Sequence, residues 1–392
     1  MIPFILAFMV CGVLNWGYTY VLGFALIVVC YPLLKRQNVK INFILEPSFW
    51  ILCAFGLTYV LFGGFSSDSI QNNLILPMVA YVIGWCSFEQ SSHDSVAVKN
   101  NILGITFGFA LHAALNYIAN TGNSNRGLLI DFWSGSYWSA TGSGFLNTMI
   151  FALLVYFVVI EQRRWIKLSF GILTVFCALY MLMLGNRTQL IILGVVTIGI
   201  GVIYLIERRR WDSLAKTFVG ICLLIVASII CYRFNIFGFA DLIDSSNLIA
   251  RFIEESEMSK SNSERAYQFW AGIKNLYQHP FGGQKAQMYY HNMWLDICRI
   301  AGIIPMVLML LYNGITLQHT VQLFQNKQID IATRYVMLSV YIGCLMNFFV
   351  EPVLEGLVSF FLSFCMINGI TDSMYFHNEM FLEDESLRSE VL

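Results

Sequence analysis

The residues best suited to chemistry lie in 261–304, the one long polar stretch of an otherwise apolar chain. This stretch contains Arg265 and, at the start of the next apolar block, His291-Asn292. A guanidinium offers a rigid fork of donors matched to phosphate oxygens, and a histidine can donate or transfer a proton near neutral pH. The pattern predicts an anion-handling site. The alternative is a solvated arginine and an interfacial histidine satisfied by a backbone carbonyl.

A second arginine lies where cations are unusual in membrane proteins. Arg187 follows Gly185-Asn186 in a short turn between two apolar blocks, on the side of the membrane that we expect to be the outer one. An arginine there runs against the usual excess of Lys and Arg in cytoplasmic loops. One explanation is a phosphate held by the guanidinium fork, and the other is an arginine that reaches the lipid headgroups.

The segment 121–143 is rich in Trp, Tyr, Ser and Gly, and it carries Arg126, Asp131 and Trp133. Aromatic faces combined with hydroxyl groups suit carbohydrate, because a sugar presents both C–H faces and hydroxyls. The segment therefore predicts sugar contact, with these three residues as candidate substrate-binding residues. The alternative is an aromatic belt at the membrane–water interface.

Two charged residues, Asp296 and Arg299, fall inside the apolar block that starts at His291. At 1.5 Å per residue they lie roughly 8 and 12 Å below its start. Charges at that depth are costly and usually face a cavity or each other. They are either a structural ion pair or, for Arg299, a further substrate-binding residue.

Several kinds of site have no signal in the sequence. There is no glycine-rich phosphate loop with a lysine, and no His or Cys cluster with metal-ligand spacing. The ten cysteines all fall in or beside apolar blocks, as small buried hydrophobes do. We therefore expect no metal and no cofactor. The net charge of -1 also argues against a nucleic-acid partner.

The elements that position these residues must be membrane-spanning helices. Apolar residues make up 57% of the 392 positions, charged residues only 12%, and the mean hydropathy is +0.65. The apolar blocks have the length of a bilayer span. We predict an all-α, polytopic transmembrane helix bundle of about twelve spans. They lie near 2–14, 16–34, 49–65, 74–88, 100–120, 144–161, 166–184, 188–206, 217–234, 291–312, 335–350 and 353–371.

Orientation follows from the short loops rich in Lys and Arg, which are expected to be cytoplasmic. Alternation of the spans places all three such loops, near 35–40, 163–167 and 208–216, on one side. Residues 1–392 then form a single integral membrane domain whose outer side receives the aromatic loop 121–143 and a large loop, 235–290. The large loop is expected to contain an amphipathic helix that starts near Ser261 and ends at Pro280. The acidic tail within 372–392 is expected to be cytoplasmic and disordered.

With these residues in view, the chain resembles the bacterial O-antigen polymerase and ligase superfamily, integral membrane glycosyltransferases of the GT-C type. Members show an arginine after a glycine at the outer end of a span. A later outer loop holds an arginine, a tryptophan, His-Pro with Gly, His-Asn and a Gly-Ile pair. Arg299 departs from many relatives, in which an uncharged or acidic residue is expected. The matching residues here are Gly185-Asn186-Arg187, Arg265, Trp270, His279-Pro280, Gly282-Gly283, His291-Asn292, Leu295 and Gly302-Ile303.

The resemblance implies that polyprenyl-pyrophosphate-linked oligosaccharides are the substrates. A growing glycan on one carrier lipid would move to a sugar hydroxyl on a second carrier-linked repeat unit. Arg187 and Arg265 would grip the donor pyrophosphate and remove the need for a metal. His291 would donate to the pyrophosphate or act as base, with Asp131 and Glu264 as other base candidates. Arg126, Asp131, Trp133, Asn292 and Arg299 would line the substrate site.

The resulting expectation is a polymerase of surface polysaccharide, such as O-antigen, capsule or exopolysaccharide. It would lie in the bacterial cytoplasmic membrane with its active site facing the periplasm or the exterior. Membrane lipids, a chain-length regulator and a flippase are the expected partners. One alternative is a ligase that transfers the finished glycan to another acceptor. The other, from a different class, is a transporter or flippase of a lipid-linked sugar.

Overall fold

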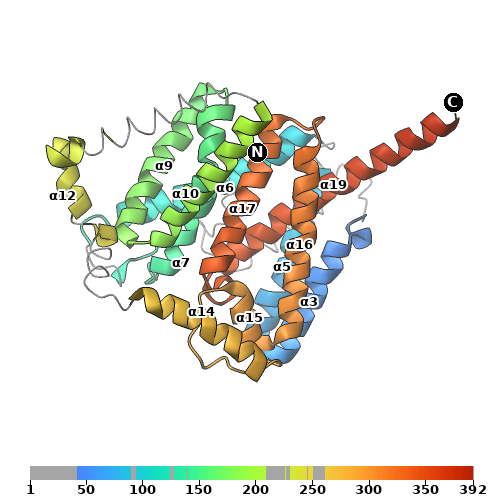
Figure 1. Ribbon diagram of the computed structural model, residues 1–392, viewed down its shortest axis with the longest axis horizontal. Coiled ribbons are helices and arrows are strands. Elements are labelled where there is room, and N and C mark those ends of the chain that lie inside the picture. Colours follow the sequence, from blue (N-terminus) through green and yellow to red (C-terminus); the bar gives the residue numbers. More distant parts are fainter. Residues whose placement is uncertain are drawn as a thin grey trace. The chain divides into compact units, whose positions relative to one another are not determined.

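Helices account for the regular structure of the part of the chain that the structure describes (Figure 1). In the described residues, β pairing is limited to an isolated bridge between Ile130 and Tyr137. The chain forms two compact units: unit 1 is Met1–Phe109 with Glu264–Leu392, and unit 2 is Ala110–Ser263. The structure is a computed structural model that describes residues 42–89, 94–123, 128–138, 140–208, 226, 230–244, 246–249 and 261–391.

Among the described residues, six helical segments are long and apolar enough to cross a membrane. This confirms an all-α membrane protein, whereas the predicted count of about twelve spans is not confirmed. The predicted spans 2–14 and 16–34, and most of 217–234, lie outside the described residues. The six segments are Ser95–Ala119, Gly142–Ile160, Arg164–Leu184, Arg187–Arg208, Ile303–Gln325 and Ile331–Val350.

In unit 2, the segment Gly142–Ile160 runs antiparallel to α9 (Arg164–Leu184). Near the end of that segment, Phe157 stacks on Phe170 at 4.2 Å between ring centroids. At its start, α7 (Ala140–Gly144) accepts a hydrogen bond from Asn186, which follows α9. The other described elements of unit 2 are η4 (Phe145–Asn147), α8 (Thr148–Ala152), η5 (Tyr156–Ile160), α10 (Arg187–Arg208), η6 (Ile236–Gly238), α12 (Phe239–Asp244) and the end of α6 (Ser95–Ala119).

Helix α10 packs on α8, and the Thr148 hydroxyl donates to Gln189 at 3.2 Å. The first turn of α10 therefore lies beside the start of the segment Gly142–Ile160, and the two run in the same direction. Arg208, at the end of α10, consequently lies at the same end of unit 2 as Arg163. The arginine turn and the aromatic loop lie at the other end. The shared end of Arg163 and Arg208 agrees with the prediction for these two loops, whereas the loop near 35–40 and residues 209–216 lie outside the described residues.

In unit 1, α5 (Leu76–Glu89) and α19 (Val358–Val391) cross at their backbones. A Cβ added to Gly84 would lie 2.0 Å from the Met366 carbonyl oxygen, and one added to Gly369 would lie 2.0 Å from that of Tyr81. Small residues allow such close helix contact in membranes. The other described elements of unit 1 are η1 (Asn42–Leu45), α3 (Pro47–Gly63), α4 (Ser67–Ile70), the π-helical η2 (Gln71–Ile75), α14 (Ser261–Gln278), α15 (Met293–Ala301), α16 (Ile303–Gln325), α17 (Ile331–Val350), α18 (Val353–Gly356) and the start of α6.

The predicted span 291–312 is wrong in its boundaries, because the helix breaks at Gly302. Gly302 has φ of 92°, which ends α15 and starts α16, so the long apolar helix runs to Gln325. A Cβ at Gly302 would lie 2.6 Å from the Pro280 carbonyl oxygen. A glycine at the break therefore also leaves room for the backbone of the preceding loop. The apolar composition continues through this break, which is why hydropathy alone placed one helix across it.

Two predictions concern the polar segments. The loop helix is confirmed as α14, and it ends at Gln278 before His279-Pro280. The predicted disorder of the acidic tail is wrong, since α19 continues as a helix to Val391. Glu, Leu, Arg and Ser in the tail do not break a helix, and the preceding turns of α19 supply its nucleus.

Candidate functional site

The aromatic loop, residues 128–138, is fastened to the end of α6 through its backbone. The Asn120 side chain accepts from the Ile130 N–H at 2.8 Å and donates to the Ile130 carbonyl at 2.7 Å. The Asn116 side chain accepts from the Phe132 N–H at 2.8 Å. Both asparagines are buried. Two polar residues one helical turn apart on α6 thus hold the path of the loop.

Asp131 anchors this loop from inside. It is only 3% exposed, and its Oδ1 lies 2.6 Å from Nε2 of the buried His112. Its Oδ2 accepts from both the N–H and the hydroxyl of Ser134, each at 2.9 Å. Burial raises the pKa of Asp131, but the hydrogen bond and charge of His112 and the hydrogen bonds of Ser134 bring that pKa down to about 2. Both oxygens are occupied, which favours a positioning role over a base role.

The anchored loop presents aromatic side chains to its surroundings. Phe132 is 43%, Trp133 38% and Tyr137 66% exposed, and the Phe132 and Trp133 rings meet edge to face at 4.9 Å. Exposed aromatic rings on a fixed backbone suit a sugar face or a lipid interface. Arg126, the other candidate of this loop, lies outside the described residues.

The arginine turn lies at the same end of unit 2 as the aromatic loop. Asn186 is buried, donates to the Ala140 carbonyl at 3.4 Å and accepts from the Thr188 N–H at 3.1 Å. Gly144 makes room, since a Cβ there would lie 1.9 Å from the Asn186 side chain. Arg187 is the first residue of α10 and is half-buried. Its charge therefore adds to the positive end of the helix dipole, and that combination favours an anion.

In unit 1, His291 precedes α15 in an uncommon backbone conformation. Its φ is 52°, a left-handed value that few non-glycine residues adopt. The side chain is 23% exposed, and its Nδ1 lies 3.7 Å from a carboxylate oxygen of Glu351, which is only 3% exposed. The Tyr289 ring stands edge-on to the imidazole at 5.9 Å. A strained, partly exposed histidine beside a buried carboxylate is an arrangement typical of functional sites.

Asn292 has a structural role in this arrangement. Its side chain caps α15 by accepting from the Leu295 N–H at 3.1 Å, and it donates to the Phe349 carbonyl at 3.3 Å. It therefore joins the start of α15 to the end of α17. The cap fixes where the helix begins and so where the preceding His291 lies.

Arg299 is fully buried, and its donors are taken up by the protein. Its Nε donates to Asp296 at 3.2 Å, and one terminal nitrogen donates to the Glu355 carboxylate. The other terminal nitrogen donates to the carbonyls of Gln284, Lys285 and Gln287 at 3.3, 3.1 and 2.9 Å. This network holds the loop before His291 against α15 and α18. It supports the structural interpretation of Arg299 over substrate binding.

The segment His279-Pro280-Phe281-Gly282-Gly283 packs against α15 and α16 through backbone hydrogen bonds. The Ile303 N–H donates to the Pro280 carbonyl at 2.8 Å, and the Gly283 N–H donates to that of Ile300 at 3.0 Å. Gly282 has φ of 77°, and a Cβ there would lie 2.6 Å from the Gly302 nitrogen. The two glycines face each other, so the motif binds the end of α14 to the junction of α15 and α16.

The predicted catalytic residues fall in different places. Arg187 belongs to unit 2 and His291 to unit 1. Arg265 lies in α14, one helix before His291, and its side chain is outside the described residues. The meeting of these three side chains at one phosphate stays a prediction.

Two residues near these sites were not singled out as site residues. Glu351 faces His291, and its signal is a Glu-Pro pair between two apolar blocks. His112 faces Asp131, and its signal is a lone histidine within an apolar span. Such signals show that a polar residue needs a partner but do not identify the partner.

No protein-family model matches the chain, and no curated protein is significantly similar to it. The function therefore has to be argued from the residues and their geometry.

Proposed function

We propose that this membrane protein is a polymerase that joins polyprenyl-pyrophosphate-linked oligosaccharide repeat units into a polysaccharide on the outer face of the cytoplasmic membrane. One observation carries the proposal. In unit 2, the arginine at the start of α10 and the exposed aromatic loop are joined at the same end by the contact of Asn186 with α7. An anion-binding group and a sugar-binding surface within one unit match a substrate that carries both pyrophosphate and sugar.

The reaction is a displacement at the donor's anomeric carbon. The acceptor's sugar hydroxyl attacks that carbon, the C–O bond to pyrophosphate breaks, and polyprenyl pyrophosphate leaves with the bonding electrons. Negative charge therefore grows on the leaving group, where Arg187 and Arg265 stabilise it. The acceptor's proton passes to a base, a role for which the buried Asp131 is unsuited.

His291 contributes as a donor to the pyrophosphate. A protonated imidazole can donate from both nitrogens, and a carboxylate oxygen of Glu351 lies 3.7 Å from its Nδ1. The exposed fraction of His291, 23%, leaves the ring accessible while the Glu351 carboxylate stays buried. Aromatic residues of the loop, among them Trp133, would contact the sugar.

The test is incubation of the purified full-length protein in lipid nanodiscs with a defined polyprenyl-pyrophosphate-linked repeat unit. A ladder of products, separated on a gel, is the expected result. Arg187→Ala is expected to lower the rate of ladder formation about 100-fold or more, as loss of a transition-state donor does. Arg163→Ala, at the opposite end of unit 2, is the matched control and should leave the ladder unchanged.

The alternatives give different products in the same assay. Transfer of a single glycan to a foreign acceptor, without a ladder, would indicate a ligase. Movement of the lipid-linked unit across a vesicle membrane without formation of a new bond would indicate a transporter. Either result would contradict the proposed polymerase.

A further inference from the structure

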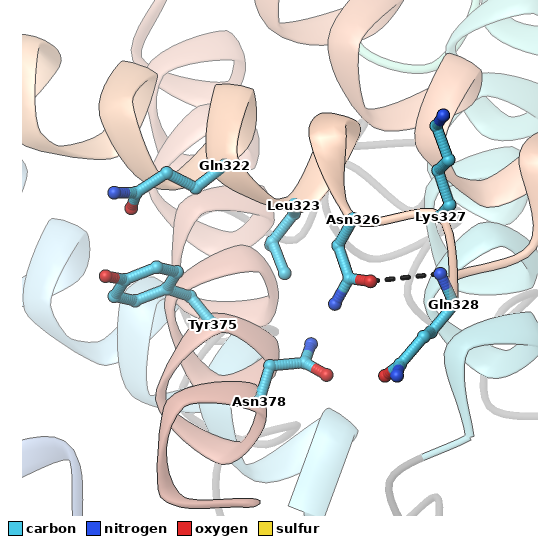
Figure 2. A pocket seen from close by; sticks show the side chains of 7 residues that line it. All are labelled: Gln322, Leu323, Asn326, Lys327, Gln328, Tyr375 and Asn378. Atoms are coloured by element: carbon cyan, nitrogen blue, oxygen red, sulfur yellow. Dashed lines mark hydrogen bonds between the residues drawn. The ribbon is translucent and has the colours of Figure 1, made fainter. Parts of the chain in front are cut away.

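A cavity in unit 1 opens beside the end of α16 and the middle of α19 (Figure 2). Its volume is about 500 Å³, and it is lined mostly by polar side chains. Tyr375 forms part of its wall. The Tyr375 ring also stacks on His319, with 4.0 Å between centroids and planes only 8° apart. The cavity therefore ends one ring away from a buried histidine.

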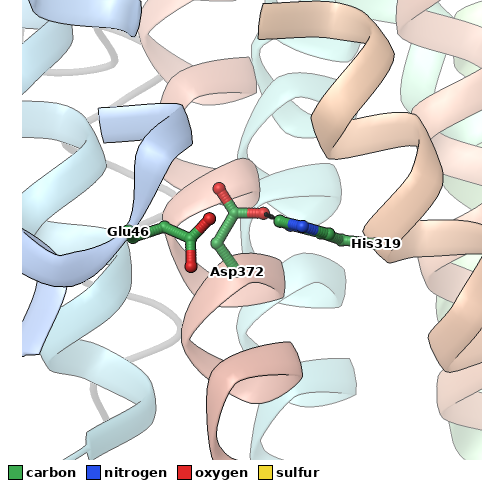
Figure 3. Close-up of side chains that lie close together, drawn as sticks. All are labelled: Glu46, His319 and Asp372. Atoms are coloured by element: carbon green, nitrogen blue, oxygen red, sulfur yellow. Dashed lines mark hydrogen bonds and ion pairs between the residues drawn. The ribbon is translucent and has the colours of Figure 1, made fainter. Parts of the chain in front are cut away.

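His319 belongs to a buried group of three side chains from three separate segments (Figure 3). Glu46 precedes α3, His319 lies on α16 and Asp372 on α19; they are 4%, 7% and 0% exposed. Each offers one oxygen or nitrogen, and these atoms all lie within 4.8 Å of one another. The closest pair is His319 Nδ1 and Asp372 Oδ1 at 2.8 Å.

Asp372 is also oriented by two neutral donors. The Ser48 hydroxyl donates to its Oδ2 at 2.5 Å, and the Tyr81 hydroxyl donates to the same oxygen at 2.9 Å. These donors come from α3 and α5, so four helices converge on this carboxylate. Hydrogen bonds that fix a ligating carboxylate, and packing that fixes an imidazole ring, are the usual surroundings of a metal site.

We propose that Glu46, His319 and Asp372 form a binding site for a divalent first-row metal ion, with Zn²⁺ as the best-matched ion. When ionised, the three side chains carry two negative charges and at most one positive charge, so a divalent cation balances them in a buried place. One imidazole nitrogen and two carboxylate oxygens are ligands that Zn²⁺ accepts, with a fourth position left for water.

The geometry needs little change to hold the ion. Two ligands at about 2.1 Å from one Zn²⁺ lie about 3.4 Å apart in a tetrahedral arrangement. Shifts of about 1 Å in the side chains therefore suffice. The proton between His319 and Asp372 leaves when the ion binds, since a metal-bound imidazole nitrogen carries no proton. We assign entry of the ion to the cavity beside Tyr375, whose ring has to move aside because it stacks on His319.

This site is separate from the proposed glycosyl-transfer chemistry. His319 lies sixteen residues along α16 from Ile303, which adjoins the loop before His291. Sixteen residues of helix extend roughly 24 Å. A metal ion there joins α3, α16 and α19 and stabilises unit 1, and it takes no part in the reaction near His291.

The experiment measures Zn²⁺ binding to the purified full-length protein in detergent, after removal of metal, by competition with a fluorescent chelator. We expect one Zn²⁺ per chain and a higher thermal unfolding temperature with Zn²⁺. His319→Gln and Glu46→Gln should each weaken binding about 100-fold and remove the thermal shift. Ser48→Ala keeps all three ligands and should weaken binding about tenfold through the oxygen that it orients.

A matched control comes from another histidine–carboxylate pair of the same unit, which is partly buried. His377→Gln removes the 2.6 Å contact of His377 with Glu89 and should leave both Zn²⁺ affinity and thermal shift at the wild-type values. The proposal is overturned if the wild type binds less than one Zn²⁺ per chain. It is equally overturned if folded His319→Gln and Glu46→Gln proteins bind Zn²⁺ as the wild type does. His319 and Asp372 would then form a hydrogen-bonded pair without a metal.

Discussion

The Nδ1 atom of His291 lies 3.7 Å from a carboxylate oxygen of Glu351, across the gap between the start of α15 and the end of α17. Glu351 is buried, so its charge acts on the imidazole with little screening by water. Glu351→Gln keeps the size of the side chain and removes the charge. We expect polymer formation to fall about tenfold to 100-fold.

A double-variant comparison separates this effect from a structural one. If the carboxylate acts through His291, Glu351→Gln combined with His291→Gln should lose no more activity than His291→Gln alone, and the unfolding temperature of Glu351→Gln should stay near that of the wild type. Lys285→Ala, on the exposed side of the same loop, serves as the control. Losses of activity that add up in the double variant would show that the carboxylate does not act through His291.

The two arginines are expected to act through their forked shape as well as their charge. Arg187→Ala and Arg265→Ala should abolish long glycan chains while the protein still reaches the membrane. Lysine at either position should also be poor, because a point charge cannot reproduce two parallel hydrogen bonds. The measurement is the chain-length ladder in cells with matched protein levels. Normal ladders from both alanine variants would refute the pyrophosphate role.

Arg299 should matter for stability. Arg299→Met leaves the buried Asp296 without its cation and frees three loop carbonyls, which should lower the free energy of unfolding by about 3–5 kcal/mol. Thermal unfolding in detergent measures the loss. Arg163, whose side chain is 43% exposed beside Glu161, is the comparison, and Arg163→Ala should cost about 1 kcal/mol or less. Equal losses in the two variants would contradict the buried network.

The aromatic loop should respond to acid in a defined range. The pKa of Asp131 is about 2 in the folded protein and near 3.9 in an unfolded chain. A lowered pKa stabilises the fold above pH 4, and this contribution disappears as the pH falls from about 4 to 2. Asp131→Asn should therefore be less stable than the wild type at pH 7, and the difference should shrink toward pH 2. A constant difference would show that the charge has no part in it.

A chelator should distinguish a structural metal site near His319 from a metal-free reaction near His291. If the metal ion near His319 is structural and the chemistry near His291 needs no metal, removing metal should lower the unfolding temperature. The initial rate, measured well below that temperature, should stay unchanged. Loss of activity that Zn²⁺ restores at low temperature would contradict the metal-free reaction.

The sequence predicted those features that depend on local composition. Apolar blocks placed most of the long helices, with α16 as the exception, and the Ser-Asn-Ser start and His-Pro end gave the limits of α14. Within α14, Gly272 and Asn275 are buried and Trp270 and Tyr277 are exposed, as expected for an amphipathic helix. Local signals of this kind need no knowledge of distant partners.

The features that were missed depend on contacts between distant segments. At the helix break, the backbone of Pro280 lies so close to Gly302 that a Cβ would not fit. Hydropathy cannot predict such a contact between distant residues. No spacing rule links Glu46, His319 and Asp372, since they come from three segments that only the fold brings together. Arg299 stood out as a buried charge, but its carbonyl partners became evident only with the path of the loop.

The crossing of α5 with α19 has a consequence for how the protein is made. The two helices fit through Gly84 and Gly369, yet most of the chain separates them. During synthesis α5 enters the bilayer long before α19 is made. The surface of α5 around Gly84 therefore lacks its contact with α19 while unit 2 is produced. A truncated chain that ends before α19 would lack this contact permanently. We expect cellular quality control to degrade such a chain.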